Sequence, residues 1–284
     1  MHSGNQSIST IERGTSMQQI LTRLCLTLCV WAPLAALAQT DPALRFMAVP
    51  AVDRSYTLSQ FKEALPAETI HLFDTQHGKE KNYRGFPLAA VLNLAFGPDW
   101  QHENYTEMIF TALDGYAAVS TLDKLGQSGG YLVFEDLDVT GWELIGSKQA
   151  NPGPYYLVWS QPQQTTQNQY PWPWGITRIE LVRFQDRYPR VYPLGVEDSS
   201  DVFQGFLTFK RRCMRCHALD QQGGKIGPDL DAPQSVTEYR SPAMLKAYIR
   251  QPSAFRYTQM PDHTDLSEKQ LDQIVDYLRH QAKQ

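Results

Sequence analysis

Residues 201–217 read DVFQGFLTFKRRCMRCH, and the end of this stretch decides how the C-terminal part of the chain folds. Its last five residues form a C-x-x-C-H motif, which is typical of covalent haem attachment. Two thiols three positions apart lie on one side of a helical turn and can reach both vinyl groups of one porphyrin. The adjacent imidazole can bind the iron from beneath. We therefore predict one covalent haem c held by Cys213, Cys216 and His217.

Two other uses of paired cysteines fit this sequence less well. A zinc site needs further soft ligands, and the only other cysteines are Cys25 and Cys29 near the N-terminus. A thioredoxin-like dithiol needs a βαβ surround, which the sequence does not predict here.

The sixth ligand of the iron is predicted from residue type and position. Met260 precedes Pro261 in a segment that lacks a helical stripe, and a neutral thioether is a good ligand for haem iron. His263 and Met244 are the alternatives that the residues leave open.

Three helices are expected in this part of the chain, over residues 201–212, 242–250 and 267–281. The last is the clearest, because Ser267 and Gln270 form a capping-box pattern at its start. An apolar stripe then follows at helical spacing, made of Leu271, Ile274, Val275 and Leu278.

Residues 201–284 resemble a class I cytochrome c domain along their whole length. Gly205, Phe209 and Cys213 follow one another at four-residue intervals, as in the first helix of that family. The resemblance implies that Gly205 lets the last helix cross closely, with Tyr277 as the matching aromatic residue.

The loop after the haem motif is also similar to that family. It reads Gly227-Pro228-Asp229-Leu230, and the resemblance implies that the Pro228 carbonyl accepts the N–H of the His217 imidazole. Pro252 and the Met260-Pro261 pair fit the same family.

The N-terminus resembles an export signal. Arg23 precedes an apolar run over residues 24–37, and Ala36-Leu37-Ala38 is a small-x-small cleavage site. We predict a signal peptide over residues 1–38, translation from Met17, a periplasmic mature protein and no stable membrane span after cleavage. An uncleaved membrane anchor is the alternative, although Pro33 interrupts the run and its length is short for a bilayer.

Residues 41–190 are predicted to form one mixed domain, joined by a linker over residues 191–200 to the domain over residues 201–284. A helix is expected over residues 88–94, after Pro87. Short apolar stretches predict strands at 70–73, 108–113, 131–134, 155–159 and 176–182. The predicted fold class is α+β, a mixed α/β domain followed by an all-α domain.

Several segments of the mixed domain resemble the molybdopterin-binding domain of the sulfite oxidase family. They are residues 83–88, 112–116 and 151–159. That family holds its metal through a cysteine thiolate, and residues 39–212 contain no cysteine. We therefore expect a sulfite-oxidase-like domain without molybdopterin.

Some features of the sequence have two interpretations. His71, His77 and His102 are either ligands of a second haem or ordinary polar histidines. The segment Tyr170-Pro171-Trp172-Pro173-Trp174 is either core packing or a docking face. A basic cluster near the haem motif either meets an acidic surface or is a solvated helix face; it contains Arg211, Arg212, Arg215 and Lys225.

Charge and motifs together favour electron transfer. The chain has 26 basic and 30 acidic residues, a net charge of −4, which argues against a nucleic-acid partner. We predict a periplasmic monohaem cytochrome that exchanges electrons with a redox partner protein and has no catalytic residues of its own. The alternatives are a haem subunit of an oxidoreductase whose upstream domain binds a small substrate or a molybdenum cofactor, and a haem-based sensor.

Overall fold

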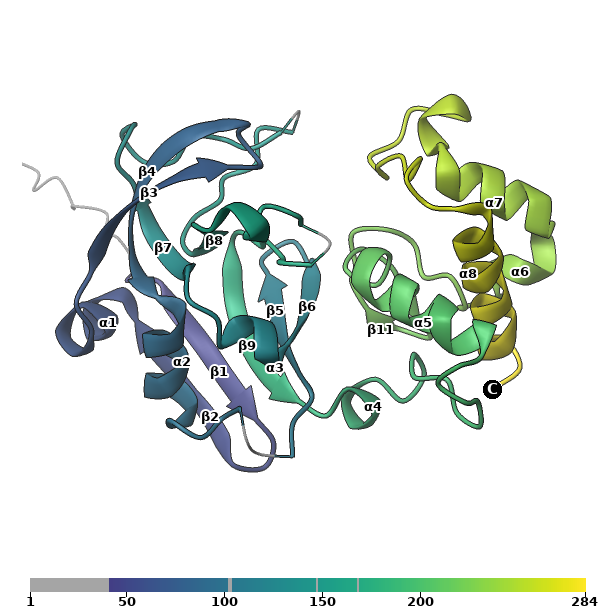
Figure 1. Cartoon of the computed structure of the whole chain (residues 1–284), viewed down its shortest axis with the longest axis horizontal. Coiled ribbons are helices and arrows are strands. Elements are labelled where there is room, and N and C mark those ends of the chain that lie inside the picture. The colour runs from purple at the N-terminus through teal and green to yellow at the C-terminus, as the bar shows by residue number, and fades with distance from the viewer. Residues whose placement is uncertain (1–40, 102–103, 147, 168) are drawn as a thin grey trace, which may run out of the picture. The chain divides into compact units, whose positions relative to one another are not determined.

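Most strands lie in the first part of the described chain and the longest helices lie in the last part (Figure 1). This computed structural model describes residues 41–101, 104–146, 148–167 and 169–284. Two sheets lie in residues 41–182, here called the strand-rich region, and helices dominate residues 201–284, here called the helical region. The predicted mixed α and β organisation is therefore present, with the sheets first and the helices last.

The larger sheet has five strands in the order β2-β1-β9-β5-β6. Strand β1 pairs in parallel with β9, and the other neighbours are antiparallel. The strands are β1 (Ala43–Ala48), β2 (Val52–Thr57), β5 (Glu107–Ala112), β6 (Ala117–Thr121) and β9 (Ile176–Val182). Both faces of β5 are buried, which explains its continuous apolar sequence.

The smaller sheet is antiparallel, in the order β3-β4-β7-β8. Its strands are β3 (Glu68–Asp74), β4 (Lys79–Pro87), β7 (Gly130–Asp136) and β8 (Tyr156–Trp159). Strand β3 alternates exposed and buried residues, as expected for a strand with one solvated face.

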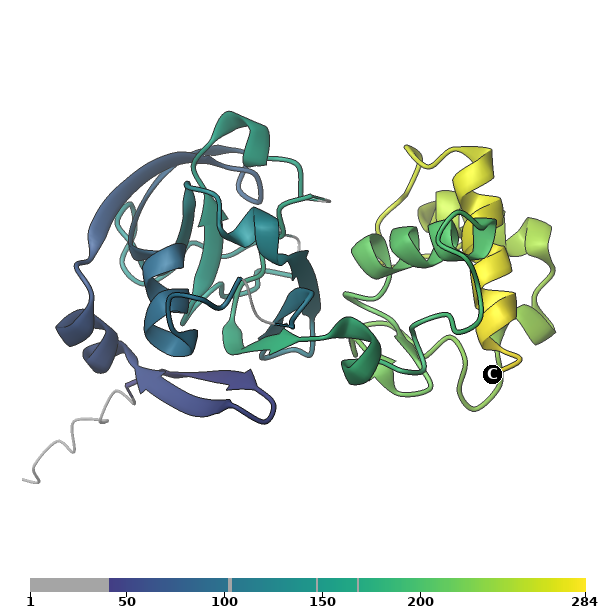
Figure 2. The ribbon, with the colours of Figure 1, turned by 60° about the horizontal axis from the view of Figure 1, so that its bottom comes forward.

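Short helices pack on these sheets (Figure 2). Helix α2 begins after Pro87, as predicted, and contacts β1, β4 and β7. The ring of Phe61 packs on Phe46 at 6.0 Å and on Phe86 at 5.8 Å, so one aromatic core joins the two sheets. The helices are α1 (Leu58–Ala64), α2 (Leu88–Phe96), α3 (Leu122–Leu125), α4 (Phe184–Arg187) and the 3-10 turn η1 (Pro162–Gln164).

The helical region contains the three predicted helices. They are α5 (Asp201–Arg212), α7 (Pro242–Arg250) and α8 (Glu268–Gln281). Ser267 and Gln270 form both bonds of the capping box at the start of α8. Smaller elements lie between the helices: β10 (Ala218–Leu219), β11 (Gln222–Gly223), α6 (Val236–Tyr239) and the 3-10 turn η2 (Pro252–Ala254).

Helices α5 and α8 cross in close contact at Gly205. A Cβ atom there would lie 1.9 Å from the Gln273 carbonyl oxygen and 2.9 Å from the Tyr277 Cβ. Only glycine leaves room for this crossing. The Tyr277 ring packs on Phe209 at 5.2 Å, so the crossing expected from the sequence is present.

Residues 41–284 form one compact unit. The predicted linker over residues 191–200 begins inside it, because Val191 is fully buried and its carbonyl accepts a bond of 2.6 Å from the Tyr277 hydroxyl.

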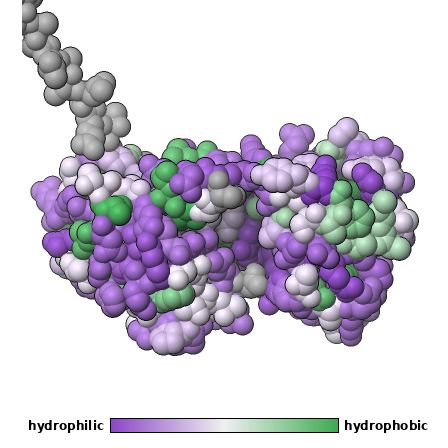
Figure 3. Space-filling model, turned by 90° about the horizontal axis from the view of Figure 1, so that it is seen from above, coloured by the Kyte–Doolittle hydropathy of each residue, from purple (hydrophilic) through white to green (hydrophobic). Residues whose placement is uncertain are grey.

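The predicted signal peptide and start at Met17 lie outside the described residues. Among the residues described, no helix is both long and apolar enough to cross a membrane. The face in Figure 3 is mostly hydrophilic, with separate apolar patches.

Candidate haem site

The end of helix α5 positions the C-x-x-C-H motif. Cys213 caps the helix, and its amide donates to the Phe209 carbonyl at 2.8 Å. The chain then turns tightly, because the amides of Cys216 and His217 both donate to the Cys213 carbonyl, at 3.0 and 2.9 Å. Both thiols are free of any disulfide. The turn therefore presents two thiols and one imidazole from a single short segment.

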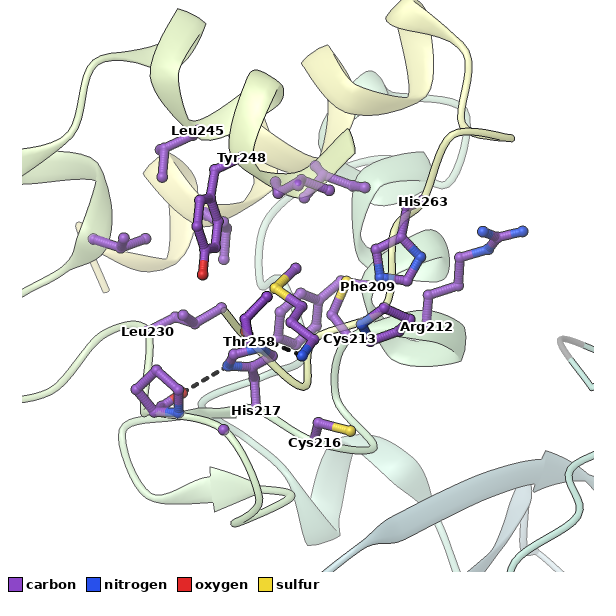
Figure 4. A pocket seen from close by; sticks show the side chains of 18 of the residues that line it. Phe209, Arg212, Cys213, Cys216, His217, Leu230, Leu245, Tyr248, Thr258 and His263 are labelled. Carbon is purple, nitrogen blue, oxygen red and sulfur yellow. Dashed lines mark hydrogen bonds between the residues drawn. The ribbon is translucent and has the colours of Figure 1, made fainter. Parts of the chain in front are cut away.

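A hydrogen bond fixes the imidazole of His217. Its Nδ1 lies 2.8 Å from the carbonyl oxygen of Pro228, as Figure 4 shows. A carbonyl can only accept, so Nδ1 carries the proton and Nε2 is left as the free donor of an electron pair. A Cβ atom on Gly227 would lie 2.6 Å from the ring, so glycine is needed beside it. The contact that the cytochrome resemblance implied for Pro228 is present.

His217, Cys213 and Cys216 line a cavity of about 780 Å³. Tyr248 and Leu245 of α7 lie across the cavity from His217 (Figure 4). Its apolar wall comes from every helix of this region and from the loop after the motif, with Phe209, Leu230, Val236, Leu245, Ile249, Ile274 and Leu278. A cavity with a large apolar wall, two thiols and the His217 imidazole fits a porphyrin, whose faces are apolar. Charged side chains such as Arg212 and Asp229 also line it.

Similarity to a known protein family identifies the helical region. The family described as cytochrome C oxidase, cbb3-type, subunit III matches residues 201–278. The C-terminal region is a cytochrome c domain. A search of curated proteins finds none with significant similarity to the chain. The helical region is called the cytochrome c domain from here on.

The protonation of the motif suits haem attachment and ligation. Burial raises the pKa of Cys213 to about 12 and also raises the pKa of Cys216. Both groups are therefore neutral thiols at neutral pH, unlike the thiolate of a redox-active dithiol. Burial lowers the pKa of His217, against the opposing effect of the Pro228 carbonyl and Asp229. A neutral imidazole, which metal ligation requires, is thereby favoured in the cytochrome c domain.

All three candidates for the sixth ligand line the cavity. Met260 is partly buried against the core of the cytochrome c domain, and its amide donates to the Thr258 hydroxyl at 3.2 Å. Met244 lies on α7, is 45% exposed, and its sulfur accepts from Arg240 at 3.5 Å. His263 projects toward Cys213 and Arg212 (Figure 4). Burial distinguishes Met260 from Met244, while Met260 and His263 both stay candidates.

The basic cluster near the motif is only partly solvated. Arg212 pairs with Asp265, and Arg215 donates to the Arg211 carbonyl. The amide of Lys225 donates to the Gly115 carbonyl of the strand-rich region at 3.1 Å. Several members of the cluster thus have partners within the chain.

The histidines of the strand-rich region do not converge. His71 is exposed and lies 3.0 Å from the Asn82 side chain, whereas His77 is buried 3.3 Å from Asp74. His102 lies outside the described residues. Within the described part of the chain, no three His, Cys, Asp or Glu side chains form a group that could hold a metal ion.

The aromatic and proline segment at residues 170–174 belongs mainly to the core. Tyr170 and Trp172 are buried, and the Trp172 ring lies 6.2 Å from that of Tyr156. Trp174 is only partly buried and stacks on Tyr116. Packing is therefore the role of most of this segment.

Three residues near the site have a place there that the sequence did not predict: Tyr248, Thr258 and Tyr116. Tyr248 and Thr258 line the cavity, and Tyr116 lies close enough to Cys216 for the two to influence each other electrostatically. No local motif surrounds Tyr248 or Thr258. Tyr116 follows a recognisable Asp-Gly turn, but its proximity to a cysteine a hundred residues later has no sequence signal.

Proposed function

We propose that the chain is an exported c-type cytochrome with a single haem, which carries single electrons to or from a redox partner protein. The observation that supports it best is the cavity itself. It brings Cys213, Cys216 and a neutral His217 with a free Nε2 to one apolar site. Few other cofactors use two thiols and an imidazole from five consecutive residues.

Each residue of the site has a distinct task in this proposal. Cys213 and Cys216 hold the porphyrin through thioether bonds, and His217 binds the iron. The Pro228 carbonyl orients the imidazole and increases its basicity. Met260 would supply the second protein ligand of the iron. When bound, the haem supplies an iron that alternates between Fe(III) and Fe(II).

The apolar wall contributes to electron transfer by excluding water. Leu230, Leu245 and Ile274 line the cavity without presenting any polar side chain. Apolar surroundings would disfavour the more highly charged ferric state of a bound haem. These side chains would therefore favour the reduced form.

The sulfite-oxidase-like identity of the strand-rich region stays a proposal. The two-sheet arrangement agrees with a mixed domain upstream of the cytochrome c domain. Residues 41–212 supply no cysteine thiolate for molybdenum. We propose that this region recognises a partner or supports the haem site.

One experiment tests the cofactor and the location together. The full chain is produced in a bacterial host with a working cytochrome maturation system, and haem, iron and molybdenum are measured in the periplasmic and cytoplasmic fractions. We expect one haem per chain in the periplasm, resistant to extraction by acidified acetone, and no stoichiometric molybdenum. The variant with both Cys213→Ala and Cys216→Ala is the control, and should contain no covalent haem.

Other results of this experiment would contradict the proposal. A colourless wild-type chain would exclude haem attachment. Two haems per chain, or one molybdenum per chain, would favour the oxidoreductase subunit over the simple carrier.

A further inference from the structure

The turn between β5 and β6 contacts the haem-attachment segment directly. The amide of Ala117 donates to the Arg215 carbonyl, in the middle of the C-x-x-C-H motif, at 3.1 Å. Two residues earlier, the Gly115 carbonyl accepts from the Lys225 amide at 3.1 Å. The turn over residues 113–116 is therefore bonded through Gly115 to the loop that follows the motif, and the first residue of β6, directly after the turn, is bonded to the motif itself.

This contact depends on glycine at position 115. Gly115 has a φ of +88°, a backbone conformation that residues other than glycine rarely adopt. A Cβ atom there would also lie 3.0 Å from the Lys225 Cβ. Both the backbone conformation and the close approach of Lys225 thus require a residue without a side chain.

Tyr116, at the end of the turn, faces the attachment motif. Arg215 and Cys216 both lie close enough to its side chain to act on it electrostatically. Behind it, the Trp174 ring stacks on Tyr116, with centroids 6.4 Å apart and planes inclined by 15°. Burial raises the pKa of Tyr116, as expected for a phenol enclosed on several sides.

The same region reaches the haem site at other points. Asp114 and Lys148 are both close enough to Cys216 to act on the pKa of its thiol: Asp114 raises it and Lys148 lowers it. Gln167 lines the haem cavity, and its side chain is held by the Thr75 hydroxyl at 3.1 Å. Asp114 and Lys148 of the strand-rich region therefore lie near Cys216, and Gln167 of the same region lies on the wall of the cavity.

We propose that the β5–β6 turn, with Tyr116 at its end, is a built-in cover for the Cys216 edge of the haem site. The cover excludes water from this edge and thereby raises the reduction potential of the bound haem. This inference rests on the proposed haem function. Water stabilises the more highly charged ferric state, so a drier haem edge favours reduction, and burial is one of the main determinants of haem potential.

The test is the midpoint potential of the full, haem-loaded chain, measured by optical redox titration. Tyr116→Ser removes the ring and should lower the potential. Tyr116→Phe keeps the ring and should remain close to the wild type. Tyr56→Ser is the matched control: Tyr56 is another half-buried tyrosine, packed on Phe46 and Phe61 within the strand-rich region, and its loss should leave the potential unchanged.

A second variant disturbs the same turn through its backbone and not through the Tyr116 ring. Gly115→Ala strains the turn and presses against Lys225, so it should shift the turn and also lower the potential. Haem content and the visible spectrum of each variant show whether the site is otherwise intact. The potential is compared only for variants whose haem content and spectrum match those of the wild type.

The outcomes separate this inference from the proposed function. A potential unchanged in both Tyr116→Ser and Gly115→Ala would overturn the cover. An equal fall in Tyr116→Phe and Tyr116→Ser would also overturn it, because the hydroxyl and not the excluded water would then be responsible. Absence of haem from the wild-type chain would refute the proposed function itself.

Discussion

Lys210 of helix α5 and Glu107 of strand β5 form a buried ion pair across 103 residues of sequence. The ammonium nitrogen lies 2.7 Å from the carboxylate Oε1, and the two side chains are only 13% and 8% exposed. The same ammonium lies over the rings of Phe184 and Phe206, at 4.8 and 5.2 Å from their centroids. The pair thus joins the strand-rich region to the cytochrome c domain at the start of the strand that leads to the Tyr116 turn.

Removing one partner of this ion pair should destabilise the protein. Lys210→Met leaves the Glu107 carboxylate buried without its cation, and we expect the free energy of unfolding to fall by about 3 kcal/mol. Urea unfolding followed by circular dichroism measures this loss. In the double variant Glu107→Leu with Lys210→Met, most of the stability should return, and a double variant as unstable as the sum of both single variants would contradict the pairing.

The crossing of α5 and α8 should not tolerate a side chain at Gly205. Gly205→Ala places a methyl group 1.9 Å from the Gln273 carbonyl oxygen, so the helices must separate. We expect a loss of about 3 kcal/mol in thermal or urea unfolding, at the upper end for an overpacked core. Gly126→Ala is the control, because its nearest neighbour is the flexible end of the Gln101 side chain, and it should cost clearly less.

Substitution of the two remaining ligand candidates should identify the sixth ligand. Met260→Ala should keep the covalent haem but lose the weak red absorption band of a methionine–iron bond, and the midpoint potential should fall. His263→Ala should preserve both. If His263→Ala changes the spectrum and Met260→Ala does not, His263 is the ligand. Visible and near-infrared spectroscopy of the purified variants makes this comparison.

A buried lysine in the smaller sheet should contribute strongly to the stability of the fold. Lys81 is fully buried, and its ammonium lies 2.8 Å from both Asp136 and Glu143. Lys81→Met leaves acidic groups without a buried partner, and we expect a loss of about 3 kcal/mol in the free energy of unfolding. Lys79→Met removes a 53% exposed partner of Glu143 and should cost less than about 1 kcal/mol. Equal losses would show that burial of Lys81 is not decisive.

The same cluster should contribute to acid sensitivity. Hydrogen bonds from Lys79 and Lys81 lower the pKa of Glu143 from 4.5 to about 2. A carboxylate with a depressed pKa stabilises the fold above its ordinary pKa, and this stabilisation is lost as the pH falls toward about 2. We therefore expect the free energy of unfolding to fall between about pH 5 and pH 2. In Glu143→Gln this dependence should be weaker, and an identical slope would exclude the contribution.

Some strands could not be predicted from the sequence. Strand β2, Val52–Thr57, is mostly exposed and mixes charged, polar and apolar residues, so it lacks a clear period of two. Strand β4, Lys79–Pro87, begins with four charged or polar residues and buries Lys81 where an apolar residue is expected. Such strands are defined by pairing with their neighbours, which local patterns do not encode.

Sequence alone was enough to predict the haem-attachment motif, the helices of the cytochrome c domain and the capping of α8. Each of these depends on residues within a few positions of one another, where covalent spacing and helical geometry fix the chemistry. Long-range packing places Tyr248 and Thr258 on the cavity wall, Tyr116 near Cys216, and Lys210 beside Glu107. These contacts join residues far apart in the chain, so they depend on how complete elements pack and not on any local pattern.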